Sequence, residues 1–491
     1  HTRAALGMTL AAVLSTSAAR AEDPKPKEVP LRPFVTCVER LATETPPHKR
    51  LRVHWGYLNR TKAPLLREVG ASNHVTGTAE GAQPKTFQPG FVVKAFTSVA
   101  DASKPSSWSL DGVTATADER SHACGPAERT TSVEQLVNPA PGSGMFLGAN
   151  FWGVQWQGTQ EYFFDQASFA AGSSPWLPQF LNDLAPYKVL RFMDWNLTND
   201  TQNPQSSWAT RRPKEQLQRE PIAYEWQIDL CNRTLKDYWV TVPHTATPEY
   251  FTQLAQLIRD QLDPRLRVYV EWSNEVWNGS FPQHAYARAQ GTQRGLPGKD
   301  PAMVFQVEQS VQLFDAFSRT FGADNPRVVN VLAGQAAWAG PCNAQLAALA
   351  HPKINPKQIK PHVYAIAPYV HGESLEELRN AGLKQAEAWI ADQLSCTKKA
   401  GLPLIAYEGG QDSFALGVSG CERLQRDPGL RALYASMPDA FAKAGLRGPF
   451  VHYTHSGACW GLKVHTSDSA AASPKYQGIL DWFSRPKISK P

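Results

Sequence analysis

Apolar residues follow two different patterns along the chain, and a stretch rich in Pro and Gly separates them. Before this stretch, short segments such as 51–57 and 90–96 alternate between apolar and polar residues. After it, continuous apolar runs alternate with stretches of helical period. Alternation with period two is typical of strands with one buried face, and continuous apolar runs are typical of parallel strands covered on both faces. The chain is therefore predicted to have an all-β part followed by an α/β part.

The first part is expected to be a small antiparallel β-sandwich over residues 34–137. Its clearest local signal is the segment 108–117, where two alternating runs flank Asp111-Gly112, a dipeptide typical of tight hairpin turns. Residues 22–33, rich in Pro and charge, are predicted to be a linker, and 138–144 is predicted to be a second one. We interpret the sandwich as a structural spacer, with attachment to a substrate or surface as the alternative.

The second part, residues 145–487, is predicted to be a (β/α)₈ barrel. Eight apolar runs of strand length alternate with helical stretches such as 248–261, 302–321 and 375–394. The expected strands are 145–152, 189–193, 238–242, 266–270, 328–332, 362–367, 403–407 and 449–454. A doubly wound open sheet is the alternative, but Gly148-Ala149-Asn150-Phe151-Trp152-Gly153 lacks the GxGxxG spacing of its phosphate loop.

The N-terminus has the features of an export signal. Arg3 precedes an apolar run over 4–14, and Ala19-Arg20-Ala21 gives the small-x-small pattern of a cleavage site. We therefore expect a signal peptide over 1–21 and a secreted or periplasmic bacterial protein, with a buried N-terminal helix as the alternative. No later segment reaches about 18 uninterrupted apolar residues, so no membrane anchor is expected.

Cysteine and histidine spacing indicates disulfides rather than a metal site. The chain has 7 cysteines, so at least one thiol is unpaired within it, and no CxxC pair indicates structural zinc. Cys37 and Cys124 bracket the N-terminal part and are the expected bridge. The histidines show no HExxH or paired ligand spacing, so neither a catalytic metal nor another cofactor is expected.

The charge and the aromatic content of the chain indicate which kinds of partner it binds. The net charge is +6 from 50 basic and 44 acidic residues, without a Lys/Arg block, so no nucleic-acid partner is expected. The chain has 15 Trp, 21 Phe and 14 Tyr, and flat apolar faces of this kind suit sugar rings as well as cores. We expect a monomer that binds a polysaccharide or oligosaccharide.

Two carboxylates stand where a barrel enzyme places its chemistry, at the carboxyl ends of strands four and seven. Strand four continues into Glu271-Trp272-Ser273-Asn274-Glu275, and strand seven continues into Tyr407-Glu408. Cleavage of a glycosidic bond needs such a pair, one carboxyl protonated and the other ionised. Glu275 and Glu408 are the predicted catalytic pair, and Glu271, deeper on strand four, is the alternative acid. Strict alternation would send Asn274 and Glu275 to opposite faces, so the strand must end or bulge there.

With Asn274-Glu275 on strand four and Glu408 on strand seven, the chain resembles clan A of the retaining glycoside hydrolases over about residues 145–487. The resemblance implies that Glu275 is the acid/base, that Glu408 is the nucleophile and that Asn274 binds the sugar 2-hydroxyl. It departs from the frequent Asn-Glu-Pro of the clan, since Val276 follows Glu275 here. No individual family within the clan is identified.

The resemblance also implies a set of substrate-binding residues at the other strand ends. These are Trp152 after strand one, Arg191 at strand two, His244 after strand three, Trp277 after strand four, Tyr369 and His371 after strand six, and Trp460 beyond strand eight. Arg191 and Tyr369 would contact the nucleophile, and Trp460 would floor the subsite of the reacting sugar. Each of these residues also has a purely structural interpretation, as a member of an ion pair, a loop histidine or a core aromatic residue.

These features together predict a secreted retaining β-glycoside hydrolase, acting inside a polysaccharide by double displacement. An insertion over 196–236 would wall one side of the cleft, and Trp152, Trp156, Trp195, Trp277 and Trp338 would stack successive sugars. A non-catalytic carbohydrate-binding barrel and a transglycosylase are the alternatives. A Ser-His-Asp hydrolase is disfavoured because no GxSxG elbow is present.

Overall fold

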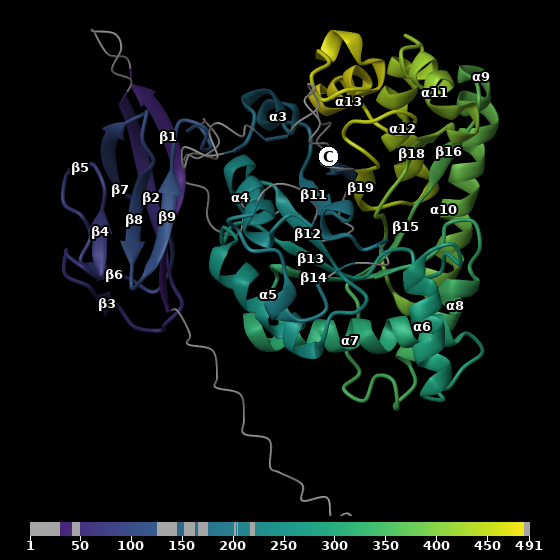
Figure 1. Cartoon of the computed structure of the whole chain (residues 1–491), viewed down its shortest axis with the longest axis horizontal. Coiled ribbons are helices and arrows are strands. Elements are labelled where there is room, and N and C mark those ends of the chain that lie inside the picture. The colour runs from purple at the N-terminus through teal and green to yellow at the C-terminus, as the bar shows by residue number, and fades with distance from the viewer. Residues whose placement is uncertain are drawn as a thin grey trace, which may run out of the picture.

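The computed structural model describes residues 30–41, 50–124, 145–151, 163–164, 175–200, 203, 205–216 and 221–485. Antiparallel sheets from the N-terminal part lie beside a larger α/β barrel (Figure 1). The expected signal peptide, both expected linkers except 30–33, and Trp152 and Trp156 lie outside the described residues.

The N-terminal part consists of short antiparallel sheets, as predicted. The four-stranded sheet has the order β1 (Leu31–Leu41), β2 (Arg50–Asn59), β7 (Gly90–Asp101), β5 (Thr78–Glu80), and the three-stranded sheet has the order β4 (Asn73–Val75), β8 (Ser106–Leu110), β9 (Val113–Ala117). Strands β3 (Leu65–Leu66) and β6 (Thr86–Phe87) form a separate pair. Trp55, Phe87, Phe96 and Trp108 pack in one buried cluster between the sheets.

The hairpin predicted at Asp111-Gly112 joins β8 to β9. Both turn residues have positive φ, 48° at Asp111 and 84° at Gly112, as a two-residue turn between right-twisted strands requires. The predicted start of the sandwich at residue 34 is wrong by three residues, because β1 begins at Leu31. Leu31 is fully buried in the sandwich core, and its apolar side chain draws 31–33 into the sheet rather than the linker. The other expected domain limits stay predictions.

The eight predicted barrel strands are present, and they close into one parallel barrel. In order they are β10 (Met145–Asn150), β11 (Val189–Phe192), β12 (Asp237–Val242), β13 (Val268–Trp272), β14 (Val328–Ala333), β15 (Val363–Ile366), β17 (Leu404–Ala406) and β19 (Gly448–His452). The fold is therefore a (β/α)₈ barrel preceded by a small all-β unit, and the open-sheet alternative is wrong. Two short parallel strands, β16 (Tyr369–His371) and β18 (Gly410–Asp412), continue past the ends of β15 and β17.

Helices surround the barrel (Figure 1). The α-helices are α3 (Pro178–Asp183), α4 (Tyr224–Thr234), α5 (Pro248–Gln261), α6 (Pro282–Gln293), α7 (Pro301–Phe321), α8 (Gly340–Leu349), α9 (Leu375–Glu377), α10 (Leu383–Thr397), α11 (Gly417–Gln425), α12 (Leu430–Ala444) and α13 (Pro474–Ser484). Short helical segments are η2 (Asp194–Asn196), η3 (Trp208–Thr210), η4 (Leu378–Gly382), η5 (Lys398–Ala400), η6 (Phe414–Leu416) and η7 (Ala470–Ala472). The predicted helix 302–321 corresponds to α7, whose first turn is capped by Asp300. The predicted helix 375–394 is divided by the π-helical turn η4.

The barrel interior is filled by side chains that alternate with those facing the helices. Trp239, Tyr269, Val331, Ala365 and Ile405 belong to this inner cluster, and a larger cluster lies between strands and helices. Above the inner cluster the interior becomes polar, because Arg191 and Glu271 occupy the next inward positions after Val189 and Tyr269. The packed layer forms the floor of a pocket at the carboxyl ends of the strands.

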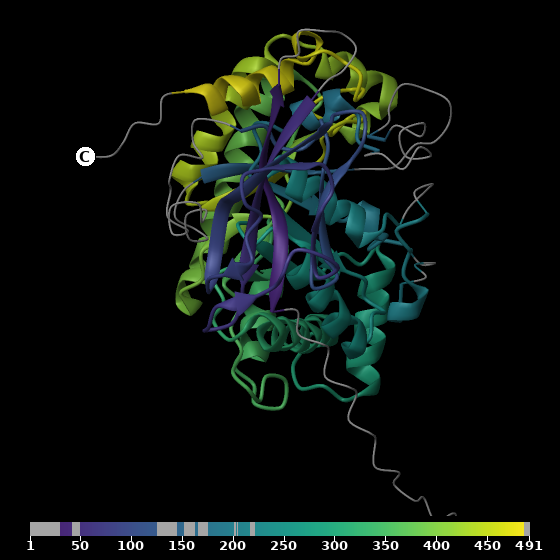
Figure 2. The same ribbon diagram turned by 90° about the vertical axis from the view of Figure 1, so that its left-hand side faces the viewer.

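The sandwich lies against the barrel, in front of it in Figure 2. Arg32 donates hydrogen bonds of 2.9 Å to the backbone carbonyls of Arg259 and Leu262, which close α5. Arg233, at the end of α4, pairs with Asp118 at 2.7 Å. Both barrel segments lead into the amino ends of β12 and β13. These contacts therefore fix the sandwich to the amino-end side of β12 and β13, and its role as a structural spacer stays a prediction.

The predicted Cys37–Cys124 disulfide is present, together with Cys342–Cys396 and Cys421–Cys459, and Cys231 is a buried free thiol. Within the described residues, a metal-ligand grouping is formed by Cys37, His54 and Cys124, but its two sulfurs are bonded to each other. No described helix has the length and apolar character needed to cross a membrane.

Candidate active site

Strand four ends in a backbone turn that brings both Asn274 and Glu275 into the pocket. Ser273 and Glu275 have positive φ values of 60° and 42°, a region that non-glycine residues seldom occupy. The strand itself stops at Trp272, so the alternation of faces no longer applies beyond it. Strained backbone held in a packed environment is typical of functional sites.

Glu408 follows strand seven and accepts hydrogen bonds from three sides. Arg191 Nη1 on β11 donates to Glu408 Oε1 at 2.7 Å, and Tyr369 Oη on β16 donates to Glu408 Oε2 at 2.9 Å. Asn150 Nδ2, at the end of β10, donates to Oε1 at 3.3 Å. The carboxylate therefore receives donors from strands one, two and six, all of which favour its ionised form.

Arg191 links the nucleophile position to strand four. Its Nε and Nη2 donate to the two oxygens of Glu271 at 3.0 and 3.1 Å, and Nη2 also donates to Asn274 Oδ1 at 2.8 Å. Trp239 Nε1 donates to Glu271 Oε2 at 2.8 Å. Glu271 is 1 % exposed and fully engaged below the pocket, so it is poorly placed to give a proton to a substrate. Glu275 is thus the better acid.

Glu275 has neutral partners only. Tyr407 Oη donates to Glu275 Oε1 at 3.2 Å, and Asn278 Nδ2 donates to Oε2 at 3.0 Å. Trp277 Nε1 donates to the same Tyr407 oxygen at 3.3 Å, which fixes the indole at the edge of the pocket. Among the described residues, no cation bonds directly to Glu275, in contrast to Glu408.

These surroundings affect the pKa values of Glu275 and Glu408 differently. Burial and the neighbouring charge of Glu408 together raise the pKa of Glu275 to about 7. Burial also raises the pKa of Glu408, but the Arg191 charge and the Tyr369 hydroxyl counteract that rise. Burial and the charge of Glu408 thus favour the protonated form of Glu275, whereas Arg191 and Tyr369 favour the ionised form of Glu408.

Tyr453 is a site residue that the sequence did not single out. It follows the last barrel strand, and its hydroxyl donates to Asp194 Oδ2 at 3.3 Å. Burial and the charges of Asp194, Glu408 and Glu275 raise its pKa. Asn150 and Tyr407 were missed as well. The sequence feature that could have indicated these two residues was their position one or two residues from a strand end.

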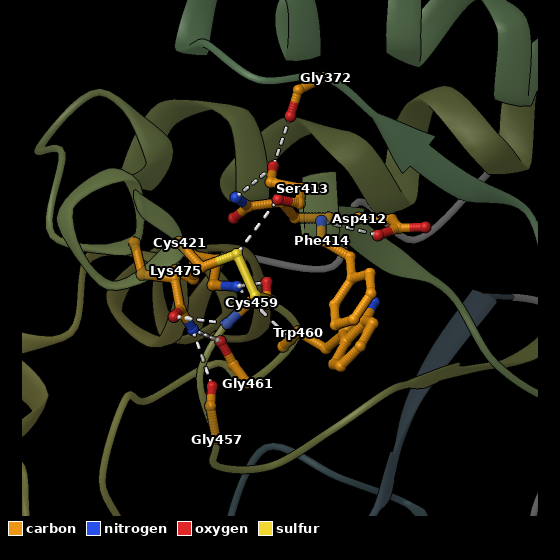
Figure 3. Close-up of a disulfide and its surroundings, with 12 residues drawn as sticks. Gly372, Asp412, Ser413, Phe414, Cys421, Gly457, Cys459, Trp460, Gly461 and Lys475 are labelled. Carbon is orange, nitrogen blue, oxygen red and sulfur yellow. Dashed lines mark hydrogen bonds between the residues drawn. A yellow bond between two sulfur atoms is a disulfide. The ribbon is translucent and has the colours of Figure 1, made fainter. Parts of the chain in front are cut away.

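Trp460 belongs to an aromatic group with Phe414 and Tyr453. Its ring stacks on Phe414 with centroids 5.2 Å apart, and Tyr453 packs edge-on against it at 6.1 Å. Figure 3 shows the Cys421–Cys459 disulfide beside this pair. Gln425 on α11 holds the same loop through the amide of Cys459 and the carbonyl of Gly461. The platform is thus fixed to α11 by covalent and polar links.

The remaining predicted residues lie in different surroundings. His244 is buried with its ring against Tyr286, and burial lowers its pKa. His371 is exposed and pairs with Asp412 at 3.2 Å, above Tyr369 on the same short strand. Trp195 was predicted to stack sugars, and this is wrong, because it is fully buried among Phe151 and other core aromatic rings. Trp152 lies outside the described residues.

No protein-family model matches the chain, and no curated protein sequence matches it either. Among solved structures, it is similar to a β-glucuronidase from Bacteroides uniformis at 11% identity and TM-score 0.41, covering 93% of this chain and 50% of that one. It is also similar to a Bacteroidetes-affiliated GH5 cellulase (10% identity, TM-score 0.40, covering 73% and 95%). A third is the intracellular xylanase TsXylA of Thermoanaerobacterium saccharolyticum (10% identity, TM-score 0.38, covering 72% and 99%). The chain thus spans half the length of the glucuronidase.

Proposed function

We propose that this protein is a secreted retaining β-glycoside hydrolase, with Glu408 as nucleophile and Glu275 as acid/base. The observation that carries the proposal is the unequal environment of two carboxyls in one pocket. Glu408 accepts from Arg191 and Tyr369, whereas the pKa of Glu275 is raised to about 7. One ionised and one protonated carboxyl are what double displacement needs. Three disulfides agree with an oxidising compartment.

In the first step, a Glu408 oxygen bonds to the anomeric carbon while the glycosidic oxygen leaves and takes the Glu275 proton. Glu408 is then a neutral ester, so its charge no longer raises the pKa of Glu275. Glu275, now ionised, removes a proton from water as the water attacks the anomeric carbon and releases Glu408. Two inversions leave the configuration of the sugar unchanged.

The neighbours of the two carboxyls position the reacting sugar relative to the nucleophile. Asn274 accepts from Arg191 through Oδ1 and gives one amide hydrogen to Asn199 Oδ1 at 3.1 Å. Its second amide hydrogen is then oriented for a sugar hydroxyl, in keeping with a contact to the 2-hydroxyl. Tyr453 and Trp277 supply the aromatic walls of the same pocket.

Aromatic side chains on both flanks support an internal mode of attack on a polysaccharide. The stacked Phe414 and Trp460 lie on the side of strands seven and eight, where the nucleophile stands. Trp338, 64% exposed, lies after strand five, beyond the acid/base. Platforms on both sides of the carboxyl pair suit a chain that continues in both directions.

Turnover of nitrophenyl β-glycosides, with the product configuration followed by proton NMR, tests the proposed function. We expect the β-anomer to appear first, and a crystal structure to place the two carboxyls about 5–5.5 Å apart. An α-anomer first, or a separation above about 6.5 Å, would contradict a retaining mechanism. Tight binding of sugars without turnover indicates the carbohydrate-binding alternative, and sugar transfer that dominates over hydrolysis indicates the transglycosylase.

The pH profile of kcat/KM should lose activity on its basic side with an apparent pKa of about 7. Glu275 must be protonated to act as an acid, so the rate falls as pH rises through the raised pKa of that group. In Glu408→Gln, carbon-13 NMR of the Glu275 carboxyl should show a lower pKa, because the neighbouring charge is gone. An unchanged value would mean that the two groups are not coupled.

Glu271→Gln tests whether this buried carboxylate acts through Arg191. Its loss leaves the guanidinium with Glu408 as its one anionic partner. The ionised nucleophile should then be held more strongly, so kcat should fall about tenfold and the acidic limb of the profile should move to lower pH. Trp239→Phe, which removes a hydrogen bond to Glu271 but no charge, is the control. A lower kcat with an unmoved limb would contradict the role of Glu271.

A further inference from the structure

A groove lies between α6 and α8, and its lining residue His284 contacts the carbonyl of Val276, which follows Glu275 in the chain. It has a volume of about 840 Å³, and its lining includes His284, Arg288, Lys299, Trp338 and Asn343. Residues of α8 from Gly340 to Ala348 form one wall, and His351, beyond the end of the helix, extends it. At a rise of 1.5 Å per residue the 10 residues of α8 span roughly 15 Å, enough for more than one sugar ring.

Helix α6 connects this groove directly to the end of strand four. Gln283 Nε2 donates to the carbonyl of Asn274 at 2.6 Å, and His284 lies 2.8 Å from the carbonyl of Val276 through its Nδ1. These two carbonyls flank Glu275 in the chain. Glu275 would protonate the departing oxygen, so the part of the substrate that leaves lies on its side. His284 joins this end of strand four to the lining of the groove.

Trp338 provides an oriented platform at the entrance of the groove. It is 64% exposed, the highest fraction among the large hydrophobic side chains of the described residues. A side chain at Gly340 would collide with its ring, since a Cβ there would lie 2.1 Å from the indole. The indole therefore lies against the first turn of α8, and most of its surface is open to solvent. An exposed, positioned indole face suits a sugar ring.

The groove also carries cationic groups that the protein leaves unpaired. Arg288 and Lys299 are exposed and have no hydrogen-bond or ion-pair partner in the part of the chain that the structure describes. Asp300, the lining carboxylate, caps α7 by accepting from the amides of Ala302 and Met303 at 3.2 Å. His284 and His351 add further nitrogen groups to the lining. An anion on the substrate is the complement of this arrangement.

We propose that this groove is a subsite for the leaving-group side of the substrate, and that it takes saccharide units bearing a carboxylate or a sulfate. The natural substrate is then an anionic polysaccharide. Trp338 stacks on the ring, while Arg288 and Lys299 bind the anion. This assignment rests on the proposed function, since it uses the place of Glu275 on the leaving-group side.

The experiment compares polymers that share a backbone and differ in charge. The pairs are carboxymethyl with hydroxyethyl cellulose, glucuronoxylan with its carboxyl-reduced form, and cellulose sulfate with hydroxyethyl cellulose. We expect the wild-type protein to cleave the anionic member of at least one pair about tenfold more efficiently, and this preference to shrink as salt rises. The pair that responds tells a carboxylate from a sulfate.

Two variants separate charge from stacking. Arg288→Gln with Lys299→Gln should remove the preference for the anionic member, with little change for the neutral one. Trp338→Ala should lower kcat/KM for both members by the same factor. Lys360→Gln with Lys384→Gln, two exposed lysines elsewhere, should keep the preference, and thermal melting confirms that each variant is folded.

The proposed function and this subsite can fail separately. Absence of turnover of any nitrophenyl β-glycoside would contradict the proposed function. Turnover of such glycosides together with cleavage of neutral polymers as efficiently as anionic ones, or of no polymer, would overturn the anionic subsite alone. A preference that survives the double Gln variant would overturn the assignment to Arg288 and Lys299.

Discussion

Glu408→Gly should lower kcat for a nitrophenyl β-glycoside by at least about 10⁴-fold, because it removes the group that forms the bond to the anomeric carbon. The variant should still fold, because Arg191 keeps its ion pair with Glu271 when Glu408 is lost. Steady-state rates and thermal melting of the variant and the wild type check both expectations.

Azide then identifies the role of the lost group. The glycine leaves space on the face from which Glu408 attacked, so azide entering there should give an α-glycosyl azide from a β-glycoside in a single inversion. Glu408→Gln removes the charge but keeps the volume, so azide should not restore its turnover. A β-glycosyl azide from Glu408→Gly would reverse the assignment of the two glutamates, and full activity of the variant would exclude Glu408 from the reaction.

The barrel could be predicted from sequence because parallel strands covered on both faces must be apolar throughout. Segments such as 189–193 and 238–242 had no other simple interpretation, and they form β11 and β12. The hairpin at Asp111-Gly112 was equally clear, because few dipeptides tolerate positive φ at both positions. The start of β1 was less clear, because Pro33 lies inside the strand and was read as part of the linker.

The carboxyl pair could be found because strand ends are the one part of a barrel where chemistry is expected. The contacts around it could not. Whether Asn274 and Glu275 share a face depends on the positive φ at Ser273 and Glu275. The residue types at these positions do not predict such a backbone conformation. Tyr407 and Tyr453 become site residues because their strands end one residue earlier, and such endpoints are set by packing of the whole barrel.

The exposure of aromatic side chains could not be predicted from the sequence either. Trp195 and Trp338 both follow strand ends at similar spacing, yet one is fully buried and the other is 64% exposed. Trp195 falls against Phe151 and Trp176 in a cluster built from several segments, whereas Trp338 rests on a glycine at the start of α8. The sequence shows that a Trp follows the end of a barrel strand. Whether its side chain is buried or exposed depends on how the neighbouring loops pack.

Glu275→Ala should produce a defect that depends on the leaving group. For a substrate with a poor leaving group, the loss of the proton donor should lower the first step by about 10²–10⁴-fold. A dinitrophenyl glycoside needs no proton, so its first step should stay within about tenfold of wild type. The ester on Glu408 should then accumulate, because the same residue is missing as the base for water. A burst of dinitrophenol, followed by slow turnover, is the expected trace.

Azide again separates the roles, with the opposite outcome. It needs no base, so it should restore turnover of the dinitrophenyl substrate and give a β-glycosyl azide, the product of two inversions through the Glu408 ester. Asn278→Ala, which removes one hydrogen-bond donor to Glu275 but keeps the carboxyl, should show neither the burst nor the rescue. An equal loss for good and poor leaving groups would mean that Glu275 does not donate the proton. Glu271, held by Arg191 on the same strand, would then have to be tested in its place.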